Sequence, residues 1–188
     1  MLKIAEFRKY VIIAGFSRAR IKNADEFLQS IGKTKEAKVD IQFFDAGLIA
    51  TWEHLYFAAL NALTAFRNCD NISKSLAMET ILYASAQRQI RKATELAGIK
   101  TTTVEVAVLV IGDKKENVDS ALSTVQKSLD AQRDDKVLRI TKEKMTAIKK
   151  TFRISDLELD TVRNEGEGEE VALTSLVIER MALLATQR

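Results

Sequence analysis

The sequence predicts an α+β (mixed α/β) fold, with a small sheet of three or four strands packed by helices and a C-terminal helical pair. Short apolar runs rich in β-branched residues alternate with amphipathic segments that repeat at helical spacing. The 188 residues suit one domain, and 46% hydrophobic residues are enough to build a core. The chain has no proline, which is typical of a helix-rich sequence.

Strands are expected where short segments are rich in apolar and β-branched residues. These runs are Tyr10–Phe16, Val39–Phe44 and the valine-rich Thr102–Ile111. Val137–Ile140 is expected to add a short edge strand. Strands interleaved with helices, without repeats, favour one domain over residues 1–188.

Helices are expected where a capping residue precedes apolar residues spaced three and four apart. Asn23, Thr51 and Ser73 or Ser75 precede such segments, and the last of these is expected to continue as one helix to Gly98. The other helices are expected at Asn117–Leu129, Glu143–Thr151, from Ser155 to an acidic linker at Asn164–Gly168, and at Val171–Ala185. Residues 153–188 would form a helical extension packed on the domain, and Lys33–Lys38 a loop.

The composition excludes several classes of protein. The 29 basic and 26 acidic residues leave a net charge of +3, which is too small to indicate nucleic-acid binding by itself. The chain has one cysteine, Cys69, and one histidine, His54. Neither an intramolecular disulfide nor a Cys/His zinc site is therefore expected, and we expect no metal ion or cofactor. The N-terminus is charged, and no apolar run reaches the roughly 18 residues of a membrane helix. A cytoplasmic protein without membrane contact is expected.

Motifs typical of catalysis are absent from the sequence. It has no glycine-rich dinucleotide or phosphate-binding loop and no Gly-x-Ser-x-Gly elbow. The paired carboxylates Asp134-Asp135 and Glu169-Glu170 are expected in solvated loops, with no apolar surroundings to shift their pKa values. We therefore expect a protein that is not an enzyme.

The segment Gln87–Lys92 combines three cations with two amides. On a continuous helix, Arg88 and Lys92 would share one face, as would Gln87 and Arg91. Cations contact phosphates, and amides bind base edges or ribose. A solvated helix face without a ligand is the alternative interpretation. Arg18, Arg20, His54 and Lys74 would strengthen the binding hypothesis if the fold brings them to this segment.

The last helix is unusually apolar, because eleven of the fifteen residues in Val171–Ala185 are apolar. A helix that is apolar on nearly all sides is either covered by its own domain or shared with a partner. If Leu173, Val177, Met181 and Leu184 dock on the domain, another surface must cover Ile178, Ala182 and Ala185. Partner contact and complete burial within the chain both stay open.

These segments resemble one known family. Phe16-Ser17-Arg18-Ala19-Arg20, Gln42, the lead into the His54 helix and Met78–Ile90 are similar to the smallest subunit of the KEOPS (EKC) complex, the PRPK-binding-protein (TPRKB) family. The string Ala84-Ser85-Ala86-Gln87-Arg88-Gln89-Ile90 resembles the archaeal members. The resemblance covers residues 10–112, and Ala86 stands where the family has glycine.

The resemblance implies a non-catalytic regulatory subunit. KEOPS makes the threonylcarbamoyladenosine modification of tRNA, and its small subunit binds the kinase/ATPase subunit directly and the other subunits indirectly. In archaea that subunit also holds the single-stranded 3′ CCA end of tRNA. RNA contacts would then come from Arg18, Arg20, His54, Lys74, Gln87, Arg88, Gln89 and Arg91. Kinase contacts would come from Ile154, Leu173, Val177, Ile178, Met181 and Leu184. A protein adaptor without RNA contact and a homodimer through the last helix are the alternatives.

Overall fold

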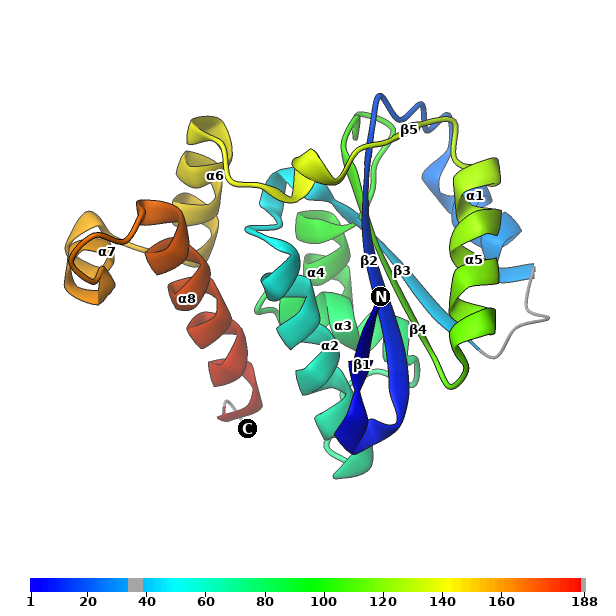
Figure 1. Cartoon of the computed structure of the whole chain (residues 1–188), viewed down its shortest axis with the longest axis horizontal. Helices are drawn as coiled ribbons and strands as arrows, with labels where there is room; N and C mark the ends of the chain where they lie inside the picture. The colour runs from blue at the N-terminus through cyan, green and yellow to red at the C-terminus, as the bar shows by residue number, and fades with distance from the viewer. Residues whose placement is uncertain (34–38, 187–188) are drawn as a thin grey trace. The chain divides into compact units, whose positions relative to one another are not determined.

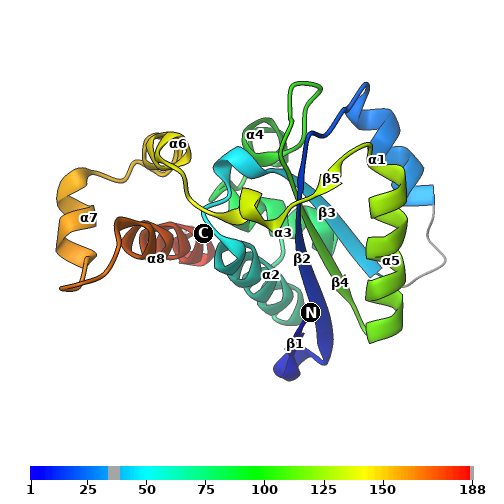
Figure 2. The same ribbon diagram turned by 45° about the horizontal axis from the view of Figure 1, so that its top comes forward.

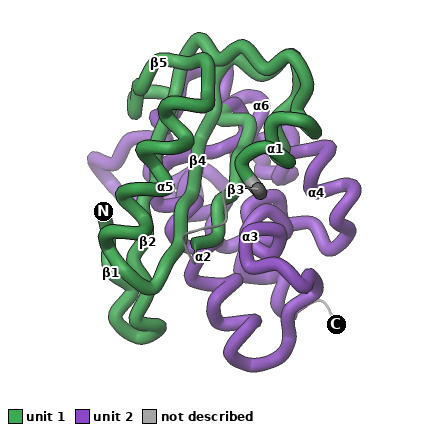
Figure 3. The backbone as a smooth tube through the Cα atoms, turned by 90° about the vertical axis from the view of Figure 1, so that its right-hand side faces the viewer, with its two compact units in different colours: residues 1–46, 98–137 green, residues 47–97, 138–188 purple. Residues whose placement is uncertain are grey.

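The computed structural model describes residues 1–33 and 39–186 (Figure 1). The chain divides into two compact units, and each of them combines two separate stretches of sequence (Figure 3). Unit 1 consists of Met1–Ala46 and Gly98–Val137, and unit 2 of Gly47–Ala97 and Leu138–Arg188. Residues 153–188, predicted to be an extension, all belong to unit 2.

Unit 1 contains an antiparallel sheet, which confirms the α+β class. The strands are β1 (Leu2–Ile4), β2 (Lys9–Ser17), β3 (Val39–Asp45), β4 (Val106–Gly112) and β5 (Gln132–Arg133). Their order is β1-β2-β4-β3, and the two-residue β5 pairs with the end of β2. Within residues 1–33 and 39–186 the sheet thus has five strands where three or four were predicted, because β1 and β5 are too short to leave an apolar pattern in the sequence.

Two helices cover one face of this sheet (Figure 2). They are α1 (Ala24–Lys33) and α5 (Lys115–Ser128). Phe16, Phe43 and Val108 belong to the core cluster that α1 and α5 share with the strands. Asn23 caps α1 as predicted, since its Oδ1 accepts from the N–H groups of Asp25 at 3.1 Å and Glu26 at 3.2 Å.

The chain after β5 lies tightly against β2 at Gly15. A Cβ on Gly15 would lie 2.5 Å from the Asp134 carbonyl oxygen, so a side chain does not fit there. The Gly15 N–H donates to Asp135 Oδ1 at 2.8 Å, and Arg133 donates to Oδ2 at 2.9 Å. Burial raises the pKa of Asp135, but these hydrogen bonds outweigh it and leave the pKa below its usual value. Asp135 is exposed to solvent as predicted. The expectation that its pKa is unshifted is wrong, because hydrogen bonds lower it.

Unit 2 is helical. Its helices are α2 (Trp52–Arg67), α3 (Leu76–Ala84), α4 (Ile90–Ala97), α6 (Lys142–Phe152), α7 (Asp156–Val162) and α8 (Glu169–Ala182). The short 3₁₀ helix η4 (Leu183–Thr186) continues from α8, while η1 (Ala5–Phe7), η2 (Ala46–Leu48) and η3 (Asp135–Leu138) lie earlier in the chain. Ile148, Leu173 and Val177 are among the residues of the apolar core of this unit.

Two predicted elements are wrong. The helix expected to run to Gly98 is broken, because α3 ends at Ala84 and α4 begins at Ile90. Val137–Ile140 forms no strand, and Val137 and Leu138 instead end the 3₁₀ helix η3. Of the predicted loop at Lys33–Lys38, Lys33 ends α1 and residues 34–38 lie outside the described residues. Among the described residues, no helix is long and apolar enough to cross a membrane.

Candidate functional site

The connection between α3 and α4 redirects the chain just before Gln87. Ala86 has a left-handed backbone with φ of 49°. Its N–H donates to the Tyr83 carbonyl at 2.8 Å, and the Gln87 N–H donates to the Leu82 carbonyl at 3.0 Å. This is the Schellman arrangement, in which the left-handed residue is usually glycine. Gln87, Arg88 and Gln89 therefore lie in a connection rather than on a helix face, and the predicted spacing on one helix is wrong for Arg88.

The connection between α3 and α4 borders a cavity of about 610 Å³, which we call the basic cavity. Four cationic side chains line it: Arg88, Lys92 from α4, Arg153 at the end of α6, and Arg180 from α8. None of the described residues that line it carries a carboxylate. The other lining residues are Ser85, Ala86, Gln87, Gln89, Thr151, Phe152 and Leu183. Cations with neutral amides and hydroxyls suit a ligand that carries several negative charges.

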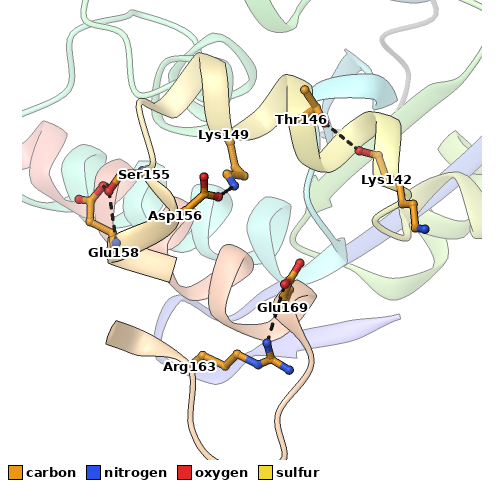
Figure 4. Close-up of polar contacts among 8 residues, drawn as sticks. All are labelled: Lys142, Thr146, Lys149, Ser155, Asp156, Glu158, Arg163 and Glu169. Carbon is orange, nitrogen blue, oxygen red and sulfur yellow. Dashed lines mark hydrogen bonds and ion pairs between the residues drawn. The ribbon is translucent and has the colours of Figure 1, made fainter. Parts of the chain in front are cut away.

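Two of these arginines are held in place by hydrogen bonds within unit 2. Arg180 donates to the carboxylate of Glu158, and Arg88 Nη1 donates to the Leu184 carbonyl at 3.4 Å. Glu158 also takes part in the capping box that begins α7: its carboxylate accepts from the Ser155 N–H, and its own N–H donates to Ser155 Oγ (Figure 4). The Ser155 N–H and Arg180 together lower the pKa of Glu158. Arg180 is thereby positioned at the edge of the cavity.

His54 does not line the cavity, in contrast to the RNA contact predicted for it. Its side chain is completely buried, Nε2 lies 2.9 Å from the Ala84 carbonyl, and Nδ1 lies 3.3 Å from the Ala50 N–H. A neutral ring with the proton on Nε2 satisfies both groups. Burial lowers the pKa of His54 to about 4. The hydrogen bond to Ala84 opposes this shift, and the positive charge of Lys144 lowers the pKa further. His54 joins α2 to the end of α3 and is not available to a ligand.

The other predicted RNA contacts are exposed but lie outside the basic cavity. Arg91 pairs with Glu95 along α4 at 3.0 Å, and Lys74 lies exposed just before α3. Arg18 and Arg20 are exposed residues of unit 1. Their convergence on Gln87–Lys92 stays a prediction.

The predicted kinase contacts are mostly internal. Ile154, Leu173, Val177, Met181 and Leu184 are at most 5% exposed. They pack inside unit 2, so the assignment of these five side chains to a partner surface is corrected, and of the predicted set only Ile178 is partly exposed. The α8 helix is not covered all round, however, because Val171 is 50% exposed.

The exposed side of α8 borders an apolar groove of about 280 Å³, which we call the α8 groove. Phe57 of α2, Val171 and Ile178 contribute its apolar surface, and Glu53 and Glu170 supply carboxylates. Thr51 also lines it, and its Oγ1 is buried without a hydrogen-bond partner among the described residues. An apolar surface bordered by carboxylates suits contact with a protein rather than with RNA.

Arg153 and Arg180 are site residues that sequence reasoning missed. They are 66 and 93 positions after Gln87 in the chain, and their own surroundings in sequence contain no binding motif. Among the described residues, no group of three or more His, Cys, Asp or Glu side chains is arranged to bind a metal ion. The site therefore consists of cations, amides and hydroxyls.

The comparison with known proteins decides the family. Residues 19–185 match the family described as kinase binding protein CGI-121. The chain belongs to the CGI-121 family. The "Regulatory protein Cgi121" of Methanocaldococcus jannaschii is 28% identical over 144 residues, which are 77% of this chain and 85% of that protein. This confirms the resemblance to the archaeal type, and the CGI-121 match extends well past residue 112 into the C-terminal helices.

Proposed function

We propose that this chain is a non-catalytic regulatory subunit of the KEOPS tRNA-modification complex, working in the cytoplasm. It binds the kinase/ATPase subunit and recruits tRNA through the single-stranded 3′ CCA end. The basic cavity is the observation that carries the RNA part of this proposal. The description of the CGI-121 family as kinase-binding supports the other part.

The cavity has the size and the chemistry that a single-stranded RNA end requires. Its volume of about 610 Å³ lies within the range of roughly 300–1,000 Å³ that is typical of ligand sites. Arg88, Lys92, Arg153 and Arg180 offer charge-assisted hydrogen bonds to phosphates. Gln87 and Gln89 present amides that donate to and accept from unpaired bases.

Charge reversal at the cavity tests the RNA part. We expect Arg88→Glu and Arg153→Glu each to weaken tRNA binding by about 10- to 100-fold, because each removes a charge-assisted contact of roughly 1.5–3 kcal/mol. Gel shifts with intact tRNA and with tRNA trimmed of its CCA end measure this. Trimming the CCA end should reduce the affinity of the wild type as much as charge reversal does. The charge-reversed variants should lose little further affinity when the tRNA is trimmed.

Arg91→Glu is the matched control. It changes the same charge three positions from Arg88, but Arg91 does not line the cavity. We expect a much smaller loss of affinity for Arg91→Glu. Equal losses at Arg88 and Arg91 would show a diffuse electrostatic effect, and no loss with any variant would favour an adaptor without RNA contact.

The α8 groove supports the kinase part of the proposal. Phe57, Val171 and Ile178 form an apolar centre, and aliphatic or aromatic anchors of a partner bury best on such a surface. Glu53 and Glu170 favour a partner segment with basic residues around its apolar anchors. The kinase subunit is therefore expected to dock with an apolar segment flanked by Lys or Arg.

A further inference from the structure

Two helices of unit 2 lead into the basic cavity through the same kind of turn. The α3 helix is followed by left-handed Ala86, with φ of 49°, and α6 by left-handed Arg153, with φ of 54°. Both residues line the basic cavity. The Ile154 N–H donates to the Lys149 carbonyl at 2.9 Å and closes the α6 turn, as the Gln87 N–H closes the α3 turn. Each turn therefore carries one arginine of the cavity, either on its left-handed residue or two positions after it.

His54 contacts the ends of both helices from inside unit 2. Its Nε2 bonds the carbonyl of Ala84, the last residue of α3, at 2.9 Å. Its ring packs edge-on against Phe152, the last residue of α6, with the ring centroids 5.8 Å apart and the planes at 78°. All three residues belong to unit 2. One buried imidazole thus joins the two helix ends that precede the arginines of the cavity.

Both ring nitrogens of His54 are used by backbone groups. Nδ1 accepts from the Ala50 N–H at 3.3 Å while Nε2 bonds Ala84, so the ring is held in one orientation. The ring is completely buried and cannot contact a ligand itself. An aliphatic side chain of similar size would fill the space but would not bond the Ala84 carbonyl or the Ala50 N–H. The contact to the end of α3 therefore depends on the imidazole nitrogens and not only on the volume of the ring.

The positions of the cavity's arginines depend on the backbone at these helix ends. The hydrogen bond from Arg88 to the Leu184 carbonyl is long, at 3.4 Å, so the backbone after α3 largely decides where the Arg88 guanidinium lies. Arg153 directly follows Phe152, so its position depends in the same way on the end of α6. A site binds tightly when its charged groups are already held in the bound geometry, since less conformational freedom is lost on binding.

We propose that His54 is a positioning residue for RNA binding, because it holds the ends of α3 and α6 and thereby fixes the backbone that carries Arg88 and Arg153. The inference rests on the proposed RNA-binding function and adds to it a residue that does not contact RNA. It also gives His54 a part in RNA binding that differs from the direct contact expected from the sequence.

The first test is His54→Leu, which fills the space but bonds neither backbone group. We expect it to weaken binding of a short single-stranded RNA ending in CCA by about tenfold, because its arginines are no longer held in place. Fluorescence anisotropy at equal concentrations of folded protein measures the affinity. The slope of log K against log salt should also become less negative by about 0.7, the value of one phosphate contact. Wild-type affinity and slope in folded His54→Leu would overturn the inference.

A double-mutant cycle with Arg88→Gln separates positioning from a purely structural role. Arg88→Gln should weaken RNA binding about tenfold in the wild type but much less in His54→Leu, where Arg88 is already misplaced. His54→Gln keeps an N–H donor for the Ala84 carbonyl and should restore the full effect of Arg88→Gln. Equal effects of Arg88→Gln in the wild type and in His54→Leu would show that His54 does not position Arg88.

Leu63→Ala is the matched control for a loss of stability. Leu63 is a buried residue of α2 that is not among the residues lining the basic cavity. Its truncation should destabilise the protein and leave the salt slope of the folded protein unchanged. A loss of affinity and slope in Leu63→Ala equal to that in His54→Leu would mean general destabilisation and would contradict the positioning role.

Phe152→Leu tests the α6 side and replaces His54→Leu if that variant does not fold. It removes the ring contact with His54, so it should reduce the effect of Arg153→Gln on RNA affinity. An unchanged effect of Arg153→Gln would count against positioning through α6. Failure of the proposed function looks different, because the wild type would then bind neither the short RNA nor intact tRNA.

Discussion

His54 shows at the residue scale how burial decides the role of a side chain. The ring is completely buried and its pKa is lowered to about 4, against about 6.5 in an unfolded chain. Between these values the unfolded chain binds a proton that the folded chain does not. The stability that neutral His54 contributes is therefore fully present above pH 6.5 and is lost as the pH falls towards 4.

We expect the free energy of unfolding to fall by about 2 kcal/mol between pH 7.5 and pH 5 because of His54 alone. Urea titrations at several pH values measure it, and His54→Gln is the control because glutamine keeps an N–H donor for Ala84 without titrating. The chain has one histidine, so the variant should lose most of the pH dependence in this window. An equal slope in both proteins would contradict the buried, neutral assignment.

Ala86 adopts a backbone conformation that L-residues avoid. With φ of 49° it takes the left-handed position of the Schellman turn, where glycine carries no Cβ penalty. The left-handed conformation costs an L-residue roughly 1–2 kcal/mol, and glycine avoids this cost. Glycine in turn loses about 0.5–1 kcal/mol more chain entropy on folding than alanine does. We expect Ala86→Gly to stabilise the protein by about 0.5 kcal/mol, measured by thermal and urea unfolding. Ala86→Val, with a branched side chain at the same φ, should destabilise it.

The same residues explain how far the sequence could predict the site. Gln87, Arg88 and Gln89 were predictable because they are adjacent in sequence, whatever local structure they adopt. Arg153 and Arg180 were not, because the packing of α6 and α8 in unit 2 brings them to the cavity from distant positions. His54 was misassigned because its side of α2 is buried against the end of α3, which no local pattern reports.

At the scale of elements, α8 has a buried side and an exposed side. Its sequence is apolar on both, so periodicity alone did not separate Met181, which is fully buried, from Ile178, which is partly exposed. The separation comes from the helices that pack on α8, which are α2, α3, α6 and α7. The same limit explains the broken helix at Ala86, since Gln87–Lys92 are all acceptable helix formers.

We expect Ile178→Glu to leave the fold intact and to weaken kinase binding by about a hundredfold, because it places a charge in an apolar contact worth roughly 3 kcal/mol. Isothermal titration calorimetry with the purified kinase subunit measures it. Met181→Glu is the contrasting variant and should unfold the protein, because its carboxylate would be buried without a partner. Unchanged kinase affinity for Ile178→Glu and Val171→Glu together would place the kinase contact elsewhere.

At the scale of the whole molecule, the net charge of +3 conceals a local concentration of cations. The sequence predicted the three longest strands because each is rich in apolar and β-branched residues, and it predicted the helices from apolar spacing, four of them with a cap. Their grouping into two units was not predictable, because each unit joins stretches of chain far apart in sequence. The charge pattern that supports RNA binding exists only after this grouping.

Salt dependence measures how many cations the bound RNA neutralises. For single strands the slope of log K against log salt is about −0.7 per phosphate contact, so the four cations of the basic cavity predict a slope near −3. Affinity for tRNA should then fall roughly 50-fold between 50 and 200 mM salt. Arg153→Gln should reduce the slope by about 0.7.

The same measurement tests whether Arg18 and Arg20 of unit 1 add to the RNA binding proposed for unit 2. If they do, the wild-type slope should be nearer −4, and the double variant Arg18→Gln/Arg20→Gln should return it to about −3. A slope near −3 that the double variant leaves unchanged would restrict the RNA contacts to unit 2. Because tRNA trimmed of its CCA end loses the cavity contacts, any slope that persists with trimmed tRNA reports the cations outside the cavity.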